Sequence, residues 1–215
     1  MSFERILSEV KGAIALSFSY QAEDSVALDL LRKSGAEFEV FTLDTGKLFT
    51  ECEALRDETE RFFGVKIKRY FPDLISIAEL ERDLGEWGMR ESLEKRKRCC
   101  ETRKVEPLTR ALRGKAAWVT GLRAAQSVTR ADLKIAEFDE KFGLLKINPI
   151  VTWSEAEVFG YIADRGIPIN SLYSRGFKSI GCAPCTRAVR EGEDSRAGRW
   201  WWENPEHKEC GLHIK

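Results

Sequence analysis

Two pairs of closely spaced cysteines stand out in this sequence, Cys99 with Cys100 in "RCCETRK" and Cys182 with Cys185 in "GCAPCT". Four thiolates suit either tetrahedral zinc or an iron–sulfur cluster. Adjacent cysteines reach one small ion only with difficulty, whereas a cubane offers separate iron corners that suit neighbouring thiols. The pattern therefore favours a [4Fe–4S] cluster. Zinc and a purely structural or redox role are the alternatives.

A fifth cysteine, Cys210 in "HKECGLHIK", lies close to the C-terminus and belongs to neither pair. The thiolate is the reactive form of cysteine, and nearby His207, Lys208 and His213 favour it. A mobile tail can carry a thiol into a site, so Cys210 is a candidate nucleophile. The alternative is a stray terminal cysteine. Cys52 falls within an expected helix and is interpreted as a packing or surface residue.

Polar residues follow the first two expected strands, in "SFSYQAEDS" at 17–25 and "LDTG" at 43–46. Amides and hydroxyls at a strand–helix junction bind anions, helped by the helix dipole. Ligands of parallel sheets sit at the carboxyl ends of strands, so we expect both segments to share one crevice. Its candidate binding residues are Ser17, Ser19, Asp24, Ser25, Asp44 and Thr45. The alternative for 17–25 is a polar turn in which Asp24 caps the helix.

Four arginines are candidates for the same crevice. Arg123 and Arg130 follow a later strand in "TGLRAAQSVTR", and Arg196 and Arg199 lie in "REGEDSRAGRWWWE". Planar guanidinium groups grip phosphate or sulfate bidentately, so converging arginines indicate an anionic ligand. Solvated surface charge is the alternative. The three tryptophans at 200–202 are interpreted as packing residues and not as a stacking platform.

The elements that must position these residues alternate along the chain. We expect strands at 13–19, 37–46, 65–73, 116–122 and 144–151, and helices at 23–35, 48–64, 76–112 and 152–166. Gly35 closes the first helix, "GEWG" weakly breaks the third, and Thr152 with Glu155 forms a capping box for the last. This alternation predicts an α/β fold with a parallel sheet. Beyond Pro168 the pattern fades into a cysteine-bearing loop and a tail.

Composition narrows the class of protein. The 215 residues include 35 Lys and Arg and 35 Asp and Glu, and this balance argues against a nucleic-acid or membrane-surface partner. The N-terminus, "MSFERILSEVKGAIALSFSY", reads as neither a signal peptide nor a membrane span. We therefore expect one domain over 1–215, with a tail from about 200 to 215, in the cytoplasm, where standing disulfides are disfavoured. The sequence allows a homo-oligomer without requiring one.

Taken together, these motifs resemble the assimilatory sulfonucleotide reductases. The resemblance runs from "SFSYQAEDS" to "ECGLH" and is carried by "LDTG", "CCETRK", "GLRAAQS", "GCAPCT", "GRWWWE" and "KECGLH". It implies a fold like that of the adenine-nucleotide α-hydrolases, with a modified pyrophosphate loop at 17–25. It also implies reduction of adenylyl sulfate to sulfite and AMP. A preference for the 3′-phosphorylated substrate, or use of both, is the alternative.

The resemblance implies a two-step reaction. The tail cysteine, here Cys210, attacks the sulfur of the sulfonucleotide, and thioredoxin then reduces the resulting S-sulfocysteine and frees sulfite. In such enzymes a [4Fe–4S] cluster, which is not the electron donor, is held by cysteines at the positions of Cys99, Cys100, Cys182 and Cys185. Positions that look like the sulfate- and phosphate-contacting residues are Lys104, Arg123, Arg196, Arg199 and His213. Plain electrostatics gives Lys104 a role between cluster and sulfate.

Two departures from the family pattern concern substrate contacts: Ala124 stands where relatives often carry a basic residue, and the loop at 17–25 contains no glycine. Two other classes of protein fit less well. An ATP-using pyrophosphate-loop enzyme, such as a tRNA thiolation enzyme, needs an SGGxDS loop that this chain lacks. A non-enzymatic iron–sulfur protein leaves "KECGLH" unexplained.

Overall fold

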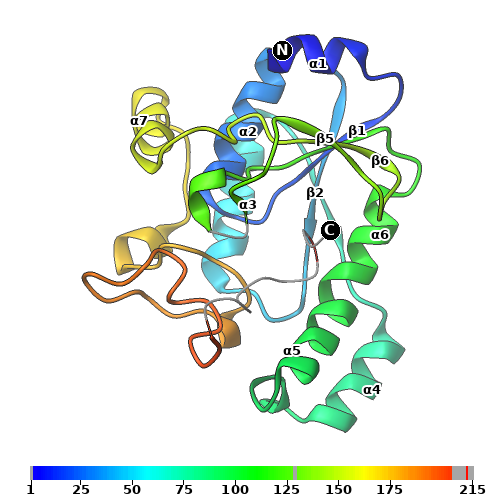
Figure 1. The fold of residues 1–215 in the computed structure, drawn as a ribbon, viewed down its shortest axis with the longest axis vertical. Coiled ribbons are helices and arrows are strands. Elements are labelled where there is room, and N and C mark those ends of the chain that lie inside the picture. Colours follow the sequence, from blue (N-terminus) through cyan, green and yellow to red (C-terminus); the bar gives the residue numbers. More distant parts are fainter. Residues whose placement is uncertain (1, 128–129, 205–211, 213–215) are drawn as a thin grey trace.

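The computed structural model describes residues 2–127, 130–204 and 212, and these build a six-stranded sheet with the order β3-β2-β1-β4-β6-β5 (Figure 1). The strands are β1 (Ile14–Ser17), β2 (Phe38–Leu43), β3 (Ile67–Tyr70), β4 (Ala117–Val119), β5 (Ala136–Asp139) and β6 (Leu144–Ile147). Neighbouring strands run parallel except at one edge, where β5 pairs antiparallel with β6. The expected α/β fold with a mostly parallel sheet is confirmed.

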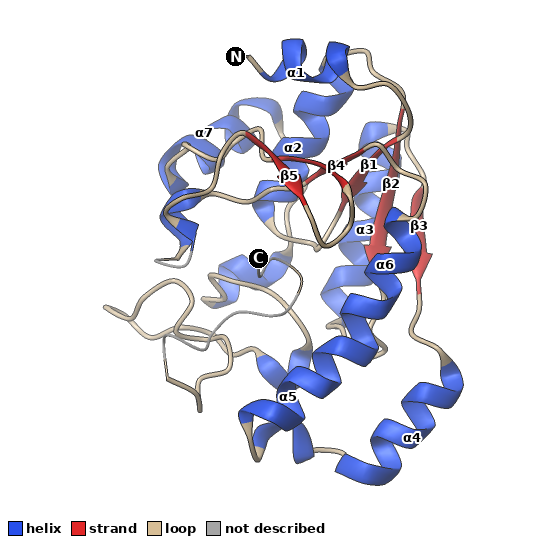
Figure 2. Cartoon of the chain, turned by 45° about the vertical axis from the view of Figure 1, so that its right-hand side comes forward, coloured by secondary structure: helices blue, strands red, loops and turns tan. Residues whose placement is uncertain are grey.

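The helices lie between and around these strands. They are α1 (Phe3–Glu9), α2 (Ala22–Lys33), α3 (Thr50–Phe63), α4 (Leu74–Leu84), α5 (Leu93–Cys100), α6 (Glu106–Leu112) and α7 (Glu155–Arg165). A π-helical stretch, Glu101–Val105, joins α5 to α6, so these segments run as one rod beside α4 (Figure 2). Short 3-10 turns include η1 (Gly88–Arg90) and η6 (Ala183–Cys185).

The sheet is buried on both faces, as parallel sheets are. Successive residues of a strand point to opposite faces. Leu16 of β1 therefore joins the core formed with α1, α2, α3 and α7, whereas Ala15 packs with Phe41, Trp118 and Leu108 on the α6 side. Near-continuous apolar strands such as "IAL" reflect this double burial. The two cores fix the strand ends on which the site is built.

Several boundaries differ from those expected from the sequence. Helix α1, with Ser2 as its N-cap, and the edge strand β5 were not expected. The expected capping box from Thr152 to Glu155 is wrong, because Ser154 accepts a hydrogen bond from the Glu157 amide and the Glu157 carboxylate accepts one from Ser154. The same spacing occurs twice in "TWSEAE", and the second copy starts the helix.

Candidate active site

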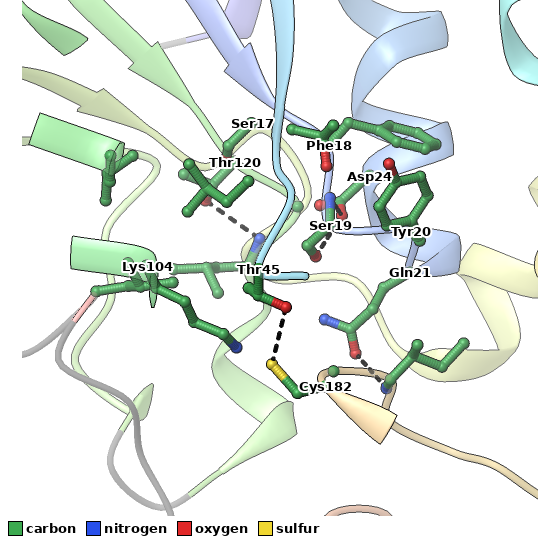
Figure 3. Close-up of a pocket in the computed structure, with 18 of the residues that line it drawn as sticks. Ser17, Phe18, Ser19, Tyr20, Gln21, Asp24, Thr45, Lys104, Thr120 and Cys182 are labelled. Atoms are coloured by element: carbon green, nitrogen blue, oxygen red, sulfur yellow. Dashed lines mark hydrogen bonds between the residues drawn. The ribbon is translucent and has the colours of Figure 1, made fainter. Parts of the chain in front are cut away.

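A cavity of about 120 Å³ opens at the carboxyl ends of β1, β2 and β4 (Figure 3). The chain crosses from β3 on one side of β1 to β4 on the other, so the cavity lies at the reversal of strand order, where α/β sheets bind ligands. Ser17, Leu43 and Thr120, at the ends of the three strands, line it. This is the crevice that the sequence predicts.

The loop after β1 is closed by Asp24. The Ser19 amide and hydroxyl each donate a hydrogen bond of 2.6 Å to the Asp24 carboxylate (Figure 3). Asp24 lies inside α2, whose N-cap is Gln21, so it braces the loop and does not cap the helix. Tyr20 has a φ of 68°, in the left-handed region that glycine normally fills. This loop contains no glycine, and the buried Tyr20 adopts the left-handed conformation in its place.

Asp24 is held in a confined space. Burial raises the pKa of its carboxyl to about 6, although the hydrogen bonds from Ser19 oppose the rise. The turn after β4 packs directly against it, since a Cβ on Gly121 would lie 2.6 Å from Asp24 Oδ1 and 2.7 Å from the Glu23 carbonyl carbon. The end of β4 and the start of α2 therefore meet without room for a side chain.

The turn after β2 divides its polar residues between two tasks. Thr45 Oγ1 lies 3.3 Å from Cys182 Sγ and lines the cavity (Figure 3). Asp44 instead accepts hydrogen bonds from the Gly46 amide at 3.0 Å and from Arg69 Nε at 3.1 Å. Asp44 is not among the described residues that line the cavity. It shapes the turn that presents Thr45.

The expected binding residues do not all meet. Those that line the cavity are Ser17, Ser19, Asp24, Thr45, Lys104, Arg196 and Arg199, together with Arg130. Ser25 donates to the Pro168 carbonyl instead. Arg123 donates twice to Glu23 Oε1, at 2.8 and 3.0 Å, and both side chains are buried beside a smaller cavity. Its charge is already balanced by Glu23.

Two residues that the sequence reasoning did not single out hold the site together. Gln21 Oε1 accepts from the Ser179 hydroxyl at 3.2 Å and the Ile180 amide at 3.3 Å, which ties the first loop to the cysteine segment. Arg103 donates to the Thr45 carbonyl at 2.7 Å. Both lie inside the motifs already quoted, so their position was visible in the sequence but their partners were not.

The two cysteine pairs come together around another cavity of about 20 Å³, distinct from the one beside Arg123. Cys99 and Cys100 end α5 just before the π-helical stretch, and Cys182 and Cys185 bracket η6. All four line this cavity, called the cysteine pocket below, and none of them is in a disulfide. Among the described residues, no three His, Cys, Asp or Glu side chains are grouped closely enough to hold one metal ion. The thiols thus surround a space and do not converge on one point.

The thiols of the cysteine pocket differ in their electrostatic surroundings. Burial raises the pKa of Cys182, but Lys104, the Thr45 hydroxyl and Arg199 outweigh burial and leave this pKa below its ordinary value. Burial raises the pKa of Cys185 to about 11, and the neighbouring Cys182 adds to the rise. Positive charge is therefore concentrated at Cys182, on the side that faces the larger cavity.

One layer of side chains separates the two cavities. Lys104, Cys182, Arg199 and Trp200 line both of them. Arg199 donates to the Ile180 carbonyl at 3.0 Å and crosses Gly181 so closely that a Cβ there would lie 2.3 Å from its Nη2. A ligand in the larger cavity therefore touches the same residues as whatever the four thiols hold.

Cys210 and His213 lie outside the described residues. Leu212, which is described, lines the larger cavity and packs near the cysteine pocket.

Comparison with known proteins identifies the family. The model of the phosphoadenosine phosphosulfate reductase domain matches residues 13–188, which includes the cavity loops and both cysteine pairs. The chain belongs to this family. The resemblance found in the sequence is confirmed at this level, and the chain is accordingly an enzyme, an oxidoreductase that acts on sulfur groups.

Relatives of this family member cover most of its length. It is 52% identical over 203 residues to an adenosine 5′-phosphosulfate reductase of Allochromatium vinosum, covering 94% of this chain and 79% of the relative. It is 46% identical over 209 residues to an adenosine 5′-phosphosulfate reductase of Rhizobium meliloti, covering 97% of this chain and 79% of the relative.

Solved structures place the same fold in two kinds of protein. A phosphoadenylyl-sulfate reductase from Candida auris, in a phosphate complex, aligns with a TM-score of 0.71 at 26% identity, covering 88% of this reductase-family chain and 91% of that one. An FMN adenylyltransferase from Candida glabrata aligns with a TM-score of 0.59 at 16% identity, covering 96% of this chain and 69% of that one. This second alignment shows a likeness of fold alone. Within the part of the chain that is described, no helix has the length and apolar character needed to cross a bilayer.

Proposed function

We propose that this enzyme reduces adenylyl sulfate to sulfite and AMP, with thioredoxin as the reductant. The relatives named adenosine 5′-phosphosulfate reductase support this choice, at 46 to 52% identity over nearly the whole chain. The single observation that carries the proposal is the wall shared by the two cavities. A cation-lined cavity at the strand ends and a pocket of four thiols have Lys104 and Arg199 in common.

The larger cavity suits a nucleotide that carries a sulfate. The loop at 17–25 and the N-terminus of α2 favour the nucleotide's phosphate, because backbone amides and the helix dipole meet there. Lys104, Arg196 and Arg199 also line the cavity and favour the sulfate. We expect His213, which lies outside the described residues, to join them. Trp118 and Leu108 supply apolar surface for the base.

We propose that Cys210 is the nucleophile. Its thiolate attacks the sulfur of adenylyl sulfate, so that an S–S bond forms, the S–O bond to the phosphate breaks and AMP leaves with the bonding electrons. A thioredoxin thiolate then attacks Cys210 Sγ, and sulfite departs with the electron pair of the S–S bond. The second thioredoxin thiol resolves the mixed disulfide, which oxidises thioredoxin by two electrons and restores the Cys210 thiol.

The four thiols of the cysteine pocket fit a [4Fe–4S] cluster. They come as an adjacent pair and a CxxC pair around one shared space, and a cubane accepts ligands at separate corners. We propose that Cys99, Cys100, Cys182 and Cys185 hold it. When bound, the cluster supplies fixed charge behind Lys104 and does not supply the electrons. Lys104 then orients the sulfate from the wall that both cavities share.

The use of thioredoxin as the reductant is consistent with a reducing compartment. The described cysteines, Cys52, Cys99, Cys100, Cys182 and Cys185, are all free. Free thiols on an enzyme whose cycle ends in a dithiol exchange fit a cytoplasmic location. We therefore propose that the enzyme works in the cytoplasm.

A steady-state assay tests the reaction. Anaerobic enzyme is mixed with adenylyl sulfate or with its 3′-phosphorylated form, with and without reduced thioredoxin, and sulfite is measured. We expect catalytic sulfite from adenylyl sulfate only when thioredoxin is present. Sulfite formation that does not depend on thioredoxin, or none from either substrate, contradicts the proposal.

Use of the 3′-phosphorylated substrate is the second candidate. The family description and the Candida auris structure both name the phosphorylated compound. Competition between the two substrates in one reaction gives the ratio of their kcat/KM values. We expect adenylyl sulfate to win, and a clear preference for the phosphorylated compound assigns the enzyme to the second candidate.

A further inference from the structure

The four residues Trp200–Glu203, called the tail root below, contact both elements that carry the cysteines of the pocket, α5 and the loop Cys182–Cys185. Arg96 of α5 donates to Glu203 at 2.6 Å, and the two side chains are buried, 1% and 8% exposed. The Arg96 guanidinium also lies 4.5 Å from the centre of the Trp200 ring. The Trp200 amide donates to the Cys185 carbonyl at 3.2 Å. The tail root is thus joined to α5 and to the loop Cys182–Cys185.

Arg90, at the end of η1, adds a third attachment. Its guanidinium carbon lies 4.4, 4.8 and 5.0 Å from the ring centres of Trp87, Trp201 and Trp202, and its Nη2 donates to the Pro184 carbonyl at 2.5 Å. A cation held over the faces of aromatic rings is attracted to them, so these contacts fix the guanidinium among the three indoles. One side chain therefore connects η1, the loop that carries the CxxC cysteines, and the tail root.

Ordinary packing does not account for this arginine. Arg90 Nε is buried and has no hydrogen-bond partner, which costs stability. An apolar side chain of similar length would fill the space among the indole rings without that cost. Arg90 is also not among the described residues that line either cavity, so it does not touch the substrate.

The tail root matters because the chain beyond it leads to Cys210. Cys210 lies seven positions after Glu203, a span of at most about 25 Å for an extended chain. Leu212, two positions after Cys210, lines the larger cavity. A displaced tail root shifts the whole range that the thiol can reach.

We propose that Arg90 is a positioning residue: it fixes the tail root on the cysteine loop and so sets where Cys210 meets the substrate. The inference rests on the proposed function, in which Cys210 attacks adenylyl sulfate. It adds a residue outside both cavities whose effect falls on the rate of attack and not on substrate binding.

The test compares Arg90→Ala, Arg90→Lys and a control, Arg82→Ala, whose side chain is 73% exposed on α4. Formation of the S-sulfocysteine adduct is followed in a single turnover at saturating adenylyl sulfate. Arg90→Ala should slow it by about ten- to a hundredfold, the cost of misplacing a reacting group. AMP affinity and visible absorbance should stay at wild-type values. Arg90→Lys, which keeps the cation and one donor, should recover most of the rate, and Arg82→Ala should match wild type.

Three results overturn the proposal. In the first, Arg90→Ala forms the adduct at the wild-type rate. In the second, its loss of rate is accompanied by weakened AMP binding. In the third, it loses visible absorbance and Arg90→Lys does not recover the rate of adduct formation. If Arg90→Ala does not fold, Arg90→Met takes its place, because it keeps the length of the side chain and removes the cation and the donor to Pro184. A wild-type rate of adduct formation in Arg90→Met, with unchanged exchange at 200–203, then overturns the proposal.

Hydrogen exchange separates this proposal from the reaction itself. Amides at 200–203 should exchange faster in Arg90→Ala than in wild type, and iodoacetamide should alkylate Cys210 at a changed rate. If wild-type enzyme forms no adduct, the proposed function fails, while these two measurements still decide whether Arg90 holds the tail root. Unchanged exchange and alkylation reject the attachment.

Discussion

At the scale of single residues, Asp24 is an acid buried in a cavity that we assign to an anion. Its pKa of about 6 exceeds the ordinary value of about 3.9 for aspartate, because burial disfavours the carboxylate. Between these two pH values the folded protein binds more protons than the unfolded chain. The free energy of unfolding therefore falls as pH rises from about 4 to about 6 through this group.

Replacing Asp24 with asparagine should remove this pH dependence. The gain in stability relative to wild type should grow from pH 4 to pH 7, with an upper bound of about 3 kcal/mol for a shift of two pKa units. Urea unfolding curves at the two pH values measure it, with Asp164→Asn on the exposed side of α7 as the control. A difference between Asp24→Asn and wild type that does not change with pH would show that Asp24 does not titrate as described.

At the scale of elements, the contact between the turn after β4 and the start of α2 closes the cavity. Gly121→Ala forces a Cβ to 2.6 Å from Asp24 Oδ1 and 2.7 Å from backbone. We expect a loss of about 1 to 3 kcal/mol of stability, typical of overpacking, and weaker AMP binding. Thermal unfolding and AMP titration measure both effects.

Gly160→Ala in the middle of α7 is the matched control. A Cβ there meets nothing within 4 Å, so alanine should stabilise the helix by about 0.5 to 1 kcal/mol and leave AMP binding unchanged. Equal behaviour of the two alanine variants would contradict the close packing of β4 against α2.

Sequence patterns predicted the alternating strands and helices because apolar periods and glycine stops are local. Gly64 ends α3 with a φ of 64°. The patterns missed β5, whose residues are half-buried or exposed at a sheet edge and show little apolar signal. They also did not reveal that Glu23 balances Arg123 or that Arg69 holds Asp44, because those partners are 100 and 25 residues apart. Motifs identify the candidate residues, and only the fold shows which of them face the cavity.

At the scale of the whole molecule, the described segment 179–203 packs against loops and a helix built by the first half of the chain. Cys182 reaches Thr45, Gln21 reaches Ile180, and Arg96 reaches Glu203. The sequence gives no indication of these pairings, yet they bring two cysteine pairs into one pocket. A cluster held there would join α5 to the loop Cys182–Cys185.

Measuring the iron content tests whether a cluster joins α5 to the loop Cys182–Cys185. Anaerobically purified enzyme should be brown and contain about four irons and four labile sulfides per chain. Cys99→Ser and Cys182→Ser should lose iron and unfold at lower temperature, because the two elements lose their common ligand. Cys52→Ala, which alters a buried cysteine outside the pocket, should keep its iron. Stoichiometric zinc without labile sulfide would contradict the cluster.

The central claim is that Cys210 takes the SO3 group from adenylyl sulfate, and trapping the intermediate tests it most directly. Wild-type enzyme is mixed with adenylyl sulfate in the absence of thioredoxin, and intact mass, released AMP and a peptide map are recorded, with Cys210→Ser in parallel. We predict a gain of one SO3 group per chain, mapped to Cys210, with one equivalent of AMP released. Cys210→Ser should keep its absorbance and form no adduct. An adduct on Cys52, or turnover by Cys210→Ser, would contradict the account.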